Sequence, residues 1–290
     1  VFGYSLHGNQ QSDMRQRLSQ SFDSFADVQG MSDRDVALQA WQDGIDIAID
    51  LNGYTQHSRT GIFTYRAAPI QINYLGYPGT LGADFMDYIV ADKFLIPEAN
   101  QKYFNEQPLY LPHTYMPTDD TRELSQKPIS RKDVGLPDDA FVFCCFNNNY
   151  KISPAEFDIW MRLLHEVSGS VLWLYAANEI ARENLIKQAG NRGISSDRLV
   201  FTKLVAFNNY INQLAHADLY LDTFNYNAGA TASNVLWAGV PLITKAGAGY
   251  ASRMASSLLQ SIGMPELITS TSEDYENLAL TLAKNPKKLK

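Results

Sequence analysis

The stretch Leu219–Gly239, LYLDTFNYNAGATASNVLWAG, has the pattern of one strand–turn–helix unit. An apolar strand ends near Asp222, a turn of small residues spans Asn227 to Thr231, and a helix follows. Small residues let backbone N–H groups approach a ligand closely, and the first turn of a helix carries about half an elementary positive charge. The stretch therefore predicts an α/β fold with a candidate diphosphate site. Tight packing of the helix on the strand would explain the same small residues equally well.

The alternation of strands and helices extends along the chain on both sides of this stretch. Phe141–Phe146 and Val171–Tyr175 predict buried strands, and Ser153–Glu156 has the cap, proline and acidic residue of a helix start. Ile45–Leu51 predicts a strand whose three isoleucines lie on one buried face. Strands separated by helices predict parallel sheets, which bind ligands beyond the carboxyl ends of their strands.

A polar segment divides the chain of 290 residues. Thr118–Lys132 combines mixed charges with a proline, which is typical of a linker. We therefore expect two doubly wound domains, at 1–117 and 135–290, joined by a linker at 118–134. The chain begins like the end of a strand and ends like an unfinished helix, so we expect a fragment of a longer polypeptide.

Composition argues against several classes of protein. A net charge of -7 and a pI of about 5.2 argue against a broad nucleic-acid surface, which needs a basic stripe. The longest apolar stretches, such as Val171–Ala177, are too short to span a bilayer. The adjacent Cys144 and Cys145 indicate free, buried thiols in a reducing compartment, and the five histidines lack metal-ligand spacing. We expect a cytoplasmic protein that uses no metal and contacts neither membrane nor nucleic acid.

Two loops are candidates for chemistry. Lys151 lies in Phe146–Pro154, FNNNYKISP, between a predicted strand and a capped helix. A lysine there can neutralise a leaving diphosphate, although a solvated surface lysine is the ordinary alternative. Leu75–Gly82, LGYPGTLG, predicts either a shaped loop at the ligand-binding edge or a plain connector. The chain has no G-x-S-x-G, Walker A or G-x-G-x-x-G motif, so hydrolase and nicotinamide-dependent functions lose support.

A series of motifs resembles the O-GlcNAc transferase family, in the family's order and spacing over nearly the whole chain. In chain order they are Asn52–Thr55, Ala68–Gln71, Leu75–Thr80, Met86–Tyr88, Leu111–Tyr115, Phe146–Asn147, Tyr150–Ile152, Ser170–Leu174, Val235–Gly239 and Ala251–Arg253. The resemblance implies a GT-B fold, in which two Rossmann-like domains face a cleft that holds the donor. It also implies transfer of N-acetylglucosamine from UDP-GlcNAc to serine or threonine hydroxyls of proteins, with inversion and without a metal or other cofactor. A bacterial-type member with upstream tetratricopeptide repeats is expected.

The resemblance also assigns roles to individual residues. Lys151 matches the family lysine that contacts the donor diphosphate, and Thr231 matches a threonine at the start of the phosphate-binding helix. Asn148 falls where the family commonly has a glutamine in the donor site. The loop expected to face the sugar or the acceptor consists of Gly76, Tyr77, Pro78, Gly79 and Thr80.

Five donor-side positions depart from the family pattern. Tyr210 replaces a histidine that stacks on uracil, which an aromatic ring can still do, and Phe207 falls near a family lysine. Gly229 and Ala230 replace a histidine–threonine pair, and Asn234 replaces an aspartate that holds the ribose hydroxyls. Two alternatives therefore stay open. One is a GT-B transferase with another nucleotide sugar or acceptor, and the other is a degenerate, non-catalytic UDP-binding or scaffold domain.

Overall fold

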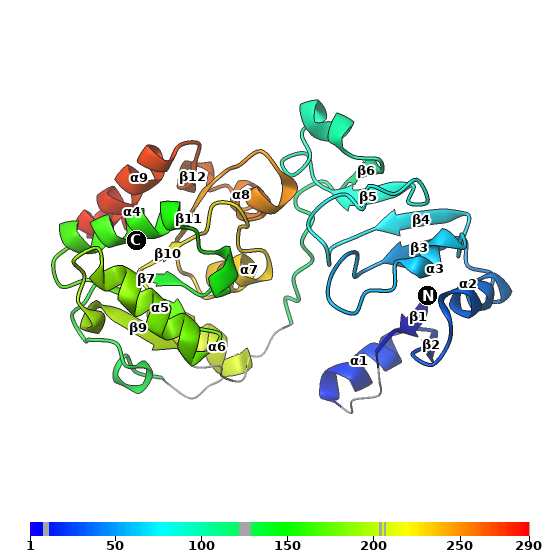
Figure 1. Ribbon diagram of the computed structural model, residues 1–290, viewed down its shortest axis with the longest axis horizontal. Coiled ribbons are helices and arrows are strands. Elements are labelled where there is room, and N and C mark those ends of the chain that lie inside the picture. The colour runs from blue at the N-terminus through cyan, green and yellow to red at the C-terminus, as the bar shows by residue number, and fades with distance from the viewer. Residues whose placement is uncertain (8–11, 122–128, 203–204, 206, 290) are drawn as a thin grey trace. The chain divides into compact units, whose positions relative to one another are not determined.

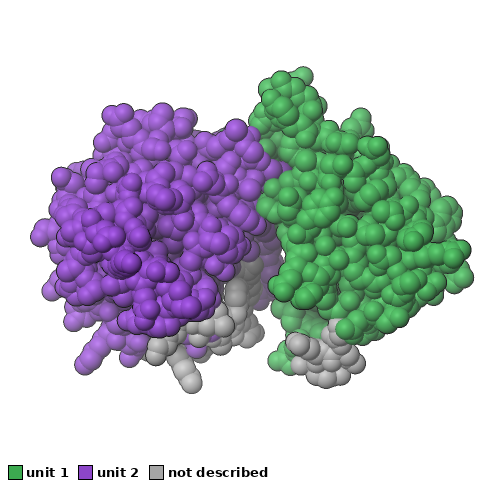
Figure 2. All heavy atoms as spheres, in the orientation of Figure 1, with its two compact units in different colours: residues 1–115 green, residues 116–290 purple. Residues whose placement is uncertain are grey.

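The structure is a computed structural model that describes residues 1–7, 12–121, 129–202, 205 and 207–289. It divides into two compact units, Val1–Tyr115 (unit 1) and Met116–Lys290 (unit 2), coloured separately in Figure 2. Residues 122–128 of the expected linker lie outside the described residues, so the linker stays a prediction.

Unit 2 is built around a six-stranded parallel sheet with the strand order β12-β11-β10-β7-β8-β9 (Figure 1). The strands are β7 (Val142–Cys145), β8 (Val171–Tyr175), β9 (Leu199–Thr202), β10 (Leu219–Leu221), β11 (Leu242–Lys245) and β12 (Ile268–Thr269). The chain runs outward from β7 to β9 and then returns to place β10 on the other side of β7. The direction of winding therefore changes between β7 and β10, and such switch points are where open parallel sheets bind ligands.

Helices connect these strands, as the alternating pattern predicts. They are α4 (Pro154–Glu166), α5 (Glu179–Gly190), α6 (Phe207–Leu214), α7 (Ala230–Trp237), α8 (Met254–Ser261), α9 (Ser272–Lys284) and α10 (Pro286–Leu289). The predicted start of α4 is confirmed, because the Ser153 N–H donates to the buried Glu156 carboxylate at 2.8 Å. The core of the unit includes Trp160 and Trp173 and the predicted buried thiols, Cys144 and Cys145.

Unit 1 contains two parallel sheets. A four-stranded sheet has the order β3-β4-β5-β6, and a separate pair joins β1 to β2. The strands are β1 (Phe2–Ser5), β2 (Ser24–Asp27), β3 (Ile47–Asp50), β4 (Ile70–Asn73), β5 (Tyr88–Ala91) and β6 (Gln107–Tyr110). The helices are α1 (Asp13–Ser21), α2 (Asp33–Gln42) and α3 (Gly61–Thr64).

The predicted burial of the isoleucines on β3 is wrong. Ile47 and Ile49 are each 50% exposed, whereas Asp50 is buried and Ala48 packs against the core of unit 1. Asp50 Oδ1 accepts a hydrogen bond from the Asn52 N–H at 2.8 Å, so this carboxylate must face inward to hold the turn after the strand. Alternation identifies the strand correctly, but the side that faces inward carries Ala48 and Asp50 instead of the isoleucines.

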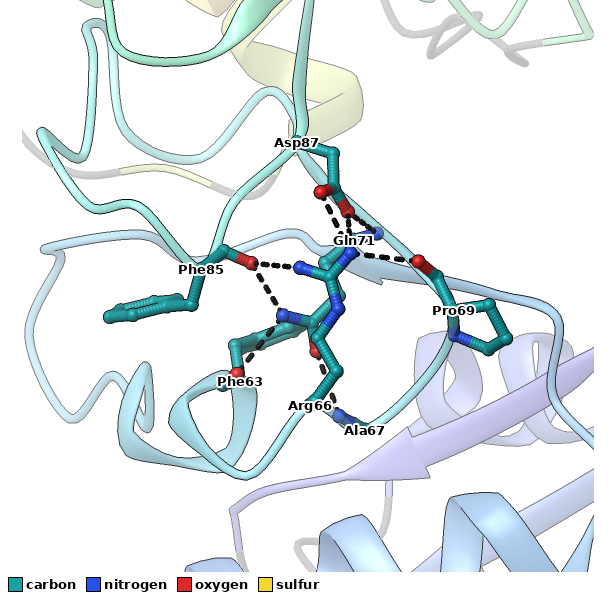
Figure 3. Close-up of polar contacts among 7 residues, drawn as sticks. All are labelled: Phe63, Arg66, Ala67, Pro69, Gln71, Phe85 and Asp87. Carbon is teal, nitrogen blue, oxygen red and sulfur yellow. Dashed lines mark hydrogen bonds and ion pairs between the residues drawn. The ribbon is translucent and has the colours of Figure 1, made fainter.

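A buried glutamine joins three segments of unit 1 (Figure 3). Gln71 on β4 is fully buried, and its Nε2 donates to the carbonyl oxygens of Phe63 at 3.0 Å and Phe85 at 2.6 Å. Its Oε1 accepts a hydrogen bond from the Ala67 N–H at 2.8 Å. The glutamine therefore links β4 to the end of α3 and to the segment before β5.

Arg66 completes this network from a left-handed backbone conformation, with φ of 56°. Its guanidinium donates to both oxygens of Asp87 at 2.7 Å and to the Phe85 carbonyl at 3.0 Å, as Figure 3 shows. Asp87 also accepts the Gln71 N–H at 2.7 Å. Gln71 and Asp87, known from the sequence only as members of motifs, thus hold the loops around β4 in place.

Replacing Gln71 with leucine is expected to destabilise unit 1 by about 1–3 kcal/mol. The Phe63 and Phe85 carbonyls each keep a donor from Arg66, but the buried Ala67 N–H loses its acceptor. Hydrogen exchange of peptides from residues 61–91 measures the change. The exposed Gln42→Leu is the matched control, and equal protection in the two variants would contradict the role of Gln71.

Candidate functional site

The switch point brings two segments far apart in the sequence to one edge of the unit 2 sheet. β7 and β10 are parallel neighbours, with Cys144 aligned to Tyr220. The chain leaves β7 through a short 3-10 turn, Asn149–Lys151, and leaves β10 through the turn before α7. The Lys151 Nζ donates to the Asn227 carbonyl at 3.1 Å. The predicted lysine and the predicted small-residue turn therefore lie against each other.

Lys151 is half-buried and held from two sides. Besides the Asn227 carbonyl, its Nζ lies 3.7 Å from the centroid of the Tyr226 ring, within range of a cation–π contact. Burial lowers the pKa of Lys151, while the negative charge of Asp222 and the Cys145 thiol oppose that shift. Lys151 is therefore a positioned cation at the switch point rather than a freely solvated surface lysine.

Asp222 is the acceptor around which this edge is organised. It is fully buried, and its Oδ1 accepts from Asn147 Nδ2 at 3.0 Å and from the backbone N–H groups of Thr223 at 2.9 Å and Ala228 at 2.8 Å. Its Oδ2 accepts from the Thr244 hydroxyl at 2.8 Å. Burial raises the pKa of Asp222 from 3.8 to about 6, partly offset by these hydrogen bonds. Sequence analysis placed Asp222 only at the end of a strand and gave it no role.

The three asparagines before Lys151 have different roles. Asn147 is buried and bridges Asp222 to the Thr223 hydroxyl, to which its Nδ2 donates at 2.8 Å. Asn149 binds the end of β8, since its side chain donates to the Tyr175 carbonyl at 2.7 Å. Asn148, the predicted donor-binding residue, is exposed. The run is therefore mainly structural, with one member available to a ligand.

The start of α7 is the second part of the candidate site. Its N-cap is Gly229, which has no side chain to cap the helix. Ala230 is exposed, while Thr231 and Asn234 are half-buried. Backbone N–H groups in the first turn of a helix lack partners within the helix, so an uncapped start suits a phosphate.

Tyr210 and Phe207 are the remaining donor-side positions, and their roles stay predictions. The half-buried ring of Tyr210 lies 6.0 Å from the Phe146 ring and packs against the core, and burial raises the Tyr210 pKa. Its expected stacking on uracil stays a prediction. The side chain of Phe207 lies outside the described residues.

The predicted loop of unit 1 is a shaped structure. A Cβ added to Gly76 would lie 2.0 Å from the Leu51 carbonyl oxygen, so only glycine fits there. The Thr80 hydroxyl and the Leu81 N–H both donate to the buried carboxylate of Glu106, the residue before β6, and the bond from Leu81 is 2.7 Å long. Asn73 Nδ2 donates to the Gly79 carbonyl at 3.0 Å. Sequence analysis missed Glu106, because it lies outside every motif.

Two kinds of structure are absent from the described residues. These residues contain no group of three or more histidine, cysteine, aspartate or glutamate side chains arranged to hold a metal ion. They also contain no helix long and apolar enough to cross a membrane.

Open parallel sheets bind ligands at such switch points, and helix starts bind phosphates. The chain has the GT-B glycosyltransferase fold. It aligns with the Anabaena protein HepE, solved with UDP and glucose, at a TM-score of 0.51 and 12% identity over 99% of this chain and 90% of that one. That similarity concerns the fold alone. The chain belongs to glycosyl transferase family 41, whose sequence profile matches residues 1–129 and 122–290.

Individual relatives support the predicted resemblance, which is thereby confirmed. The chain is 38% identical to the probable UDP-N-acetylglucosamine–peptide N-acetylglucosaminyltransferase SEC of Arabidopsis thaliana, over 100% of this chain and 30% of the relative. It is 28% identical to the Caenorhabditis elegans UDP-N-acetylglucosamine–peptide N-acetylglucosaminyltransferase, over 97% of this chain and 34% of the relative. A mutant Thermobaculum terrenum O-GlcNAc transferase aligns at a TM-score of 0.90 and 29% identity, over 100% of this chain and 55% of that one. The chain spans about a third of the length of these curated relatives.

Replacing Asp222 with asparagine tests the burial of its charge. A carboxyl group whose pKa is higher in the folded than in the unfolded state contributes stability at pH values below its unfolded pKa. This stabilisation is lost as the pH rises through the folded pKa, which is about 6 for Asp222. A shift of about two pKa units corresponds to about 3 kcal/mol. We expect the stability of D222N relative to wild type to rise by up to about 3 kcal/mol between pH 4 and pH 7.

Urea unfolding followed by tryptophan fluorescence measures this difference, because Trp160 and Trp173 are buried in unit 2. The exposed Asp138→Asn is the control, because it makes the same substitution at a carboxylate that is not buried. A relative stability of D222N that stays constant with pH would contradict a penalty for burying the charge.

Proposed function

We propose that the natural protein transfers N-acetylglucosamine from UDP-GlcNAc to serine or threonine hydroxyls of proteins. The observation that carries this proposal is the contact of Lys151 with the Asn227 carbonyl, next to the uncapped start of α7. A cation and a set of backbone donors at one sheet edge suit a nucleoside diphosphate. The names of the Arabidopsis and Caenorhabditis relatives support this donor and a peptide acceptor.

The proposed chemistry is a direct displacement with inversion. The acceptor hydroxyl attacks the anomeric carbon in line with the departing UDP. Lys151 and the first turn of α7 stabilise the charge that develops on the diphosphate, which is the role that a metal ion plays in other transferases. An ammonium has three N–H donors, and among the described residues Asn227 accepts one of them, which leaves donors for phosphate oxygens.

The wider setting is part of the same proposal. We infer a cytoplasmic protein of bacterial type, with tetratricopeptide repeats upstream and no role for nucleic acid or membrane. The TM-score of 0.90 to the Thermobaculum transferase supports the bacterial type. The net charge of -7 supports the absence of a nucleic-acid surface.

Lys151→Met in the full-length protein is expected to lower kcat with UDP-GlcNAc by about 100-fold or more, comparable to the loss of one oxyanion donor. The methionine side chain is unbranched and one atom shorter than lysine, and it removes the charge. Lys187→Met, at an exposed position on α5, is the matched control and should keep wild-type turnover. Wild-type turnover in the Lys151 variant would contradict the proposed role of Lys151 in stabilising the departing UDP.

A panel of nucleotides separates the proposal from its two alternatives. Ligand binding stabilises the folded state by mass action, by about 2.7 kcal/mol at a hundredfold excess over Kd. We expect UDP and UDP-GlcNAc to raise the Tm of the protein more than GDP, ADP or their sugars do. A different preferred nucleotide would favour another GT-B donor, and no stabilisation by any of them would favour a non-catalytic scaffold.

A further inference from the structure

Lys151 and Asp222 meet at the two ends of one peptide group. The Asn227 carbonyl accepts a hydrogen bond from Lys151 Nζ at 3.1 Å. The N–H of the same peptide group belongs to Ala228, and it donates to Asp222 Oδ1 at 2.8 Å. Asp222, Asn227 and Ala228 are all fully buried. Hydrogen bonds at both ends of a peptide group polarise it and strengthen each other, most of all where water is excluded.

The Lys151 ammonium and the Asp222 carboxylate, at the two ends of this peptide group, have opposite charges and attract each other. Burial disfavours the ammonium form of Lys151, and the negative charge of Asp222 is the largest influence that opposes it. A buried carboxylate is weakly screened, so its attraction for the ammonium acts over a longer distance than at a surface.

The other titratable groups near the Asn227–Ala228 peptide group do not supply the negative charge that Asp222 provides. Cys145 on β7 faces both residues, and Tyr220 on β10 and Tyr275 on α9 face Asp222. Burial raises the pKa of all three, to about 12 for Cys145, so they are neutral where Asp222 is ionised. Glu156 on α4 is the other nearby carboxylate, and it is bound to the Ser153 N–H at the start of that helix.

We propose that Asp222 is a positioning residue for Lys151, and that its negative charge holds the Lys151 ammonium in place through the Asn227–Ala228 peptide group. The inference rests on the proposed function only in taking Lys151 to face the donor diphosphate. Asp222 itself is fully buried, so it acts through the turn before α7.

Asp222→Asn separates charge from shape. An asparagine Oδ1 can accept the bonds from Asn147, Thr223 and Ala228, and its Nδ2 can donate to the Thr244 hydroxyl in place of the bond seen in the structure. The matched control is Thr244→Val, which removes a hydrogen bond from the same carboxylate and leaves its charge.

Acetylation of Lys151 by acetic anhydride measures the protonation of its amine directly. The rate is followed from pH 6 to pH 11 in the full-length wild type, D222N and T244V, with peptides quantified by mass spectrometry. D222N is expected to shift the midpoint of Lys151 acetylation to lower pH and to raise its rate severalfold at pH 8. T244V is expected to keep the wild-type midpoint. If D222N does not fold, Asp222→Ser removes the same charge with a smaller side chain and should give the same shift.

Turnover with UDP-GlcNAc adds a second readout. D222N is expected to lower kcat more than it changes KM, and to move the alkaline limb of kcat to lower pH. An unchanged acetylation midpoint in the folded charge-removing variant would overturn the proposal. Because acetylation needs no nucleotide, a shifted midpoint would uphold the inference even if the Lys151→Met experiment removed the proposed function.

Discussion

The buried Asp222 carboxylate is the constraint on which the candidate ligand-binding edge of unit 2 depends. It collects donors from the loop after β7, from the turn after β10 and from β11. An apolar side chain there would leave several buried donors without acceptors. Burial of the charge costs stability, while the same charge lies near the cation at the switch point. Stability and the proposed role of Asp222 beside Lys151 therefore make opposite demands on one residue, a conflict that is common at functional sites.

Unit 1 uses the same principle with different side chains. Glu106, which lies next to β6, is buried and accepts hydrogen bonds from Thr80, Leu81 and Asn73. Gln71 plays the corresponding part around β4. In both units the loops that follow the strands are held by buried polar groups from elsewhere in the chain. Rigid loops of this kind present backbone groups without the entropic cost of ordering them on binding.

The local part of the fold could be predicted from the sequence, and the long-range part could not. Strands such as β7 and β8 are continuous apolar runs, and α4 begins with a recognisable capping box. The strands β2 and β6 escaped prediction because they are half-exposed or exposed along their length, and β6 contains Pro108. On β3 the alternating pattern predicted the strand correctly, but the isoleucines predicted to be buried are exposed.

The candidate site divides in the same way. Lys151 and the turn at Asn227–Thr231 were predictable because each lies within one short strand–loop–helix segment. Their contact was not, because 76 positions separate the lysine from its acceptor and only the strand order places β7 beside β10. Asp222 and Glu106 carry no local signal at all, since their roles come from partners in other segments. The resemblance to a family supplied the chemistry that spacing left open.

The paired cysteines of β7 have a practical consequence for studying this molecule. Cys144 and Cys145 are the only thiols in the chain, both are free and fully buried, and burial raises the pKa of each. Alkylation requires an exposed thiolate, so a reagent can modify them only after the central strand has separated from its neighbours. The rate at which Cys144 and Cys145 are alkylated therefore reports how often the sheet of unit 2 opens. A ligand that holds β7 and β10 together should lower this alkylation rate, whether or not the ligand goes on to react.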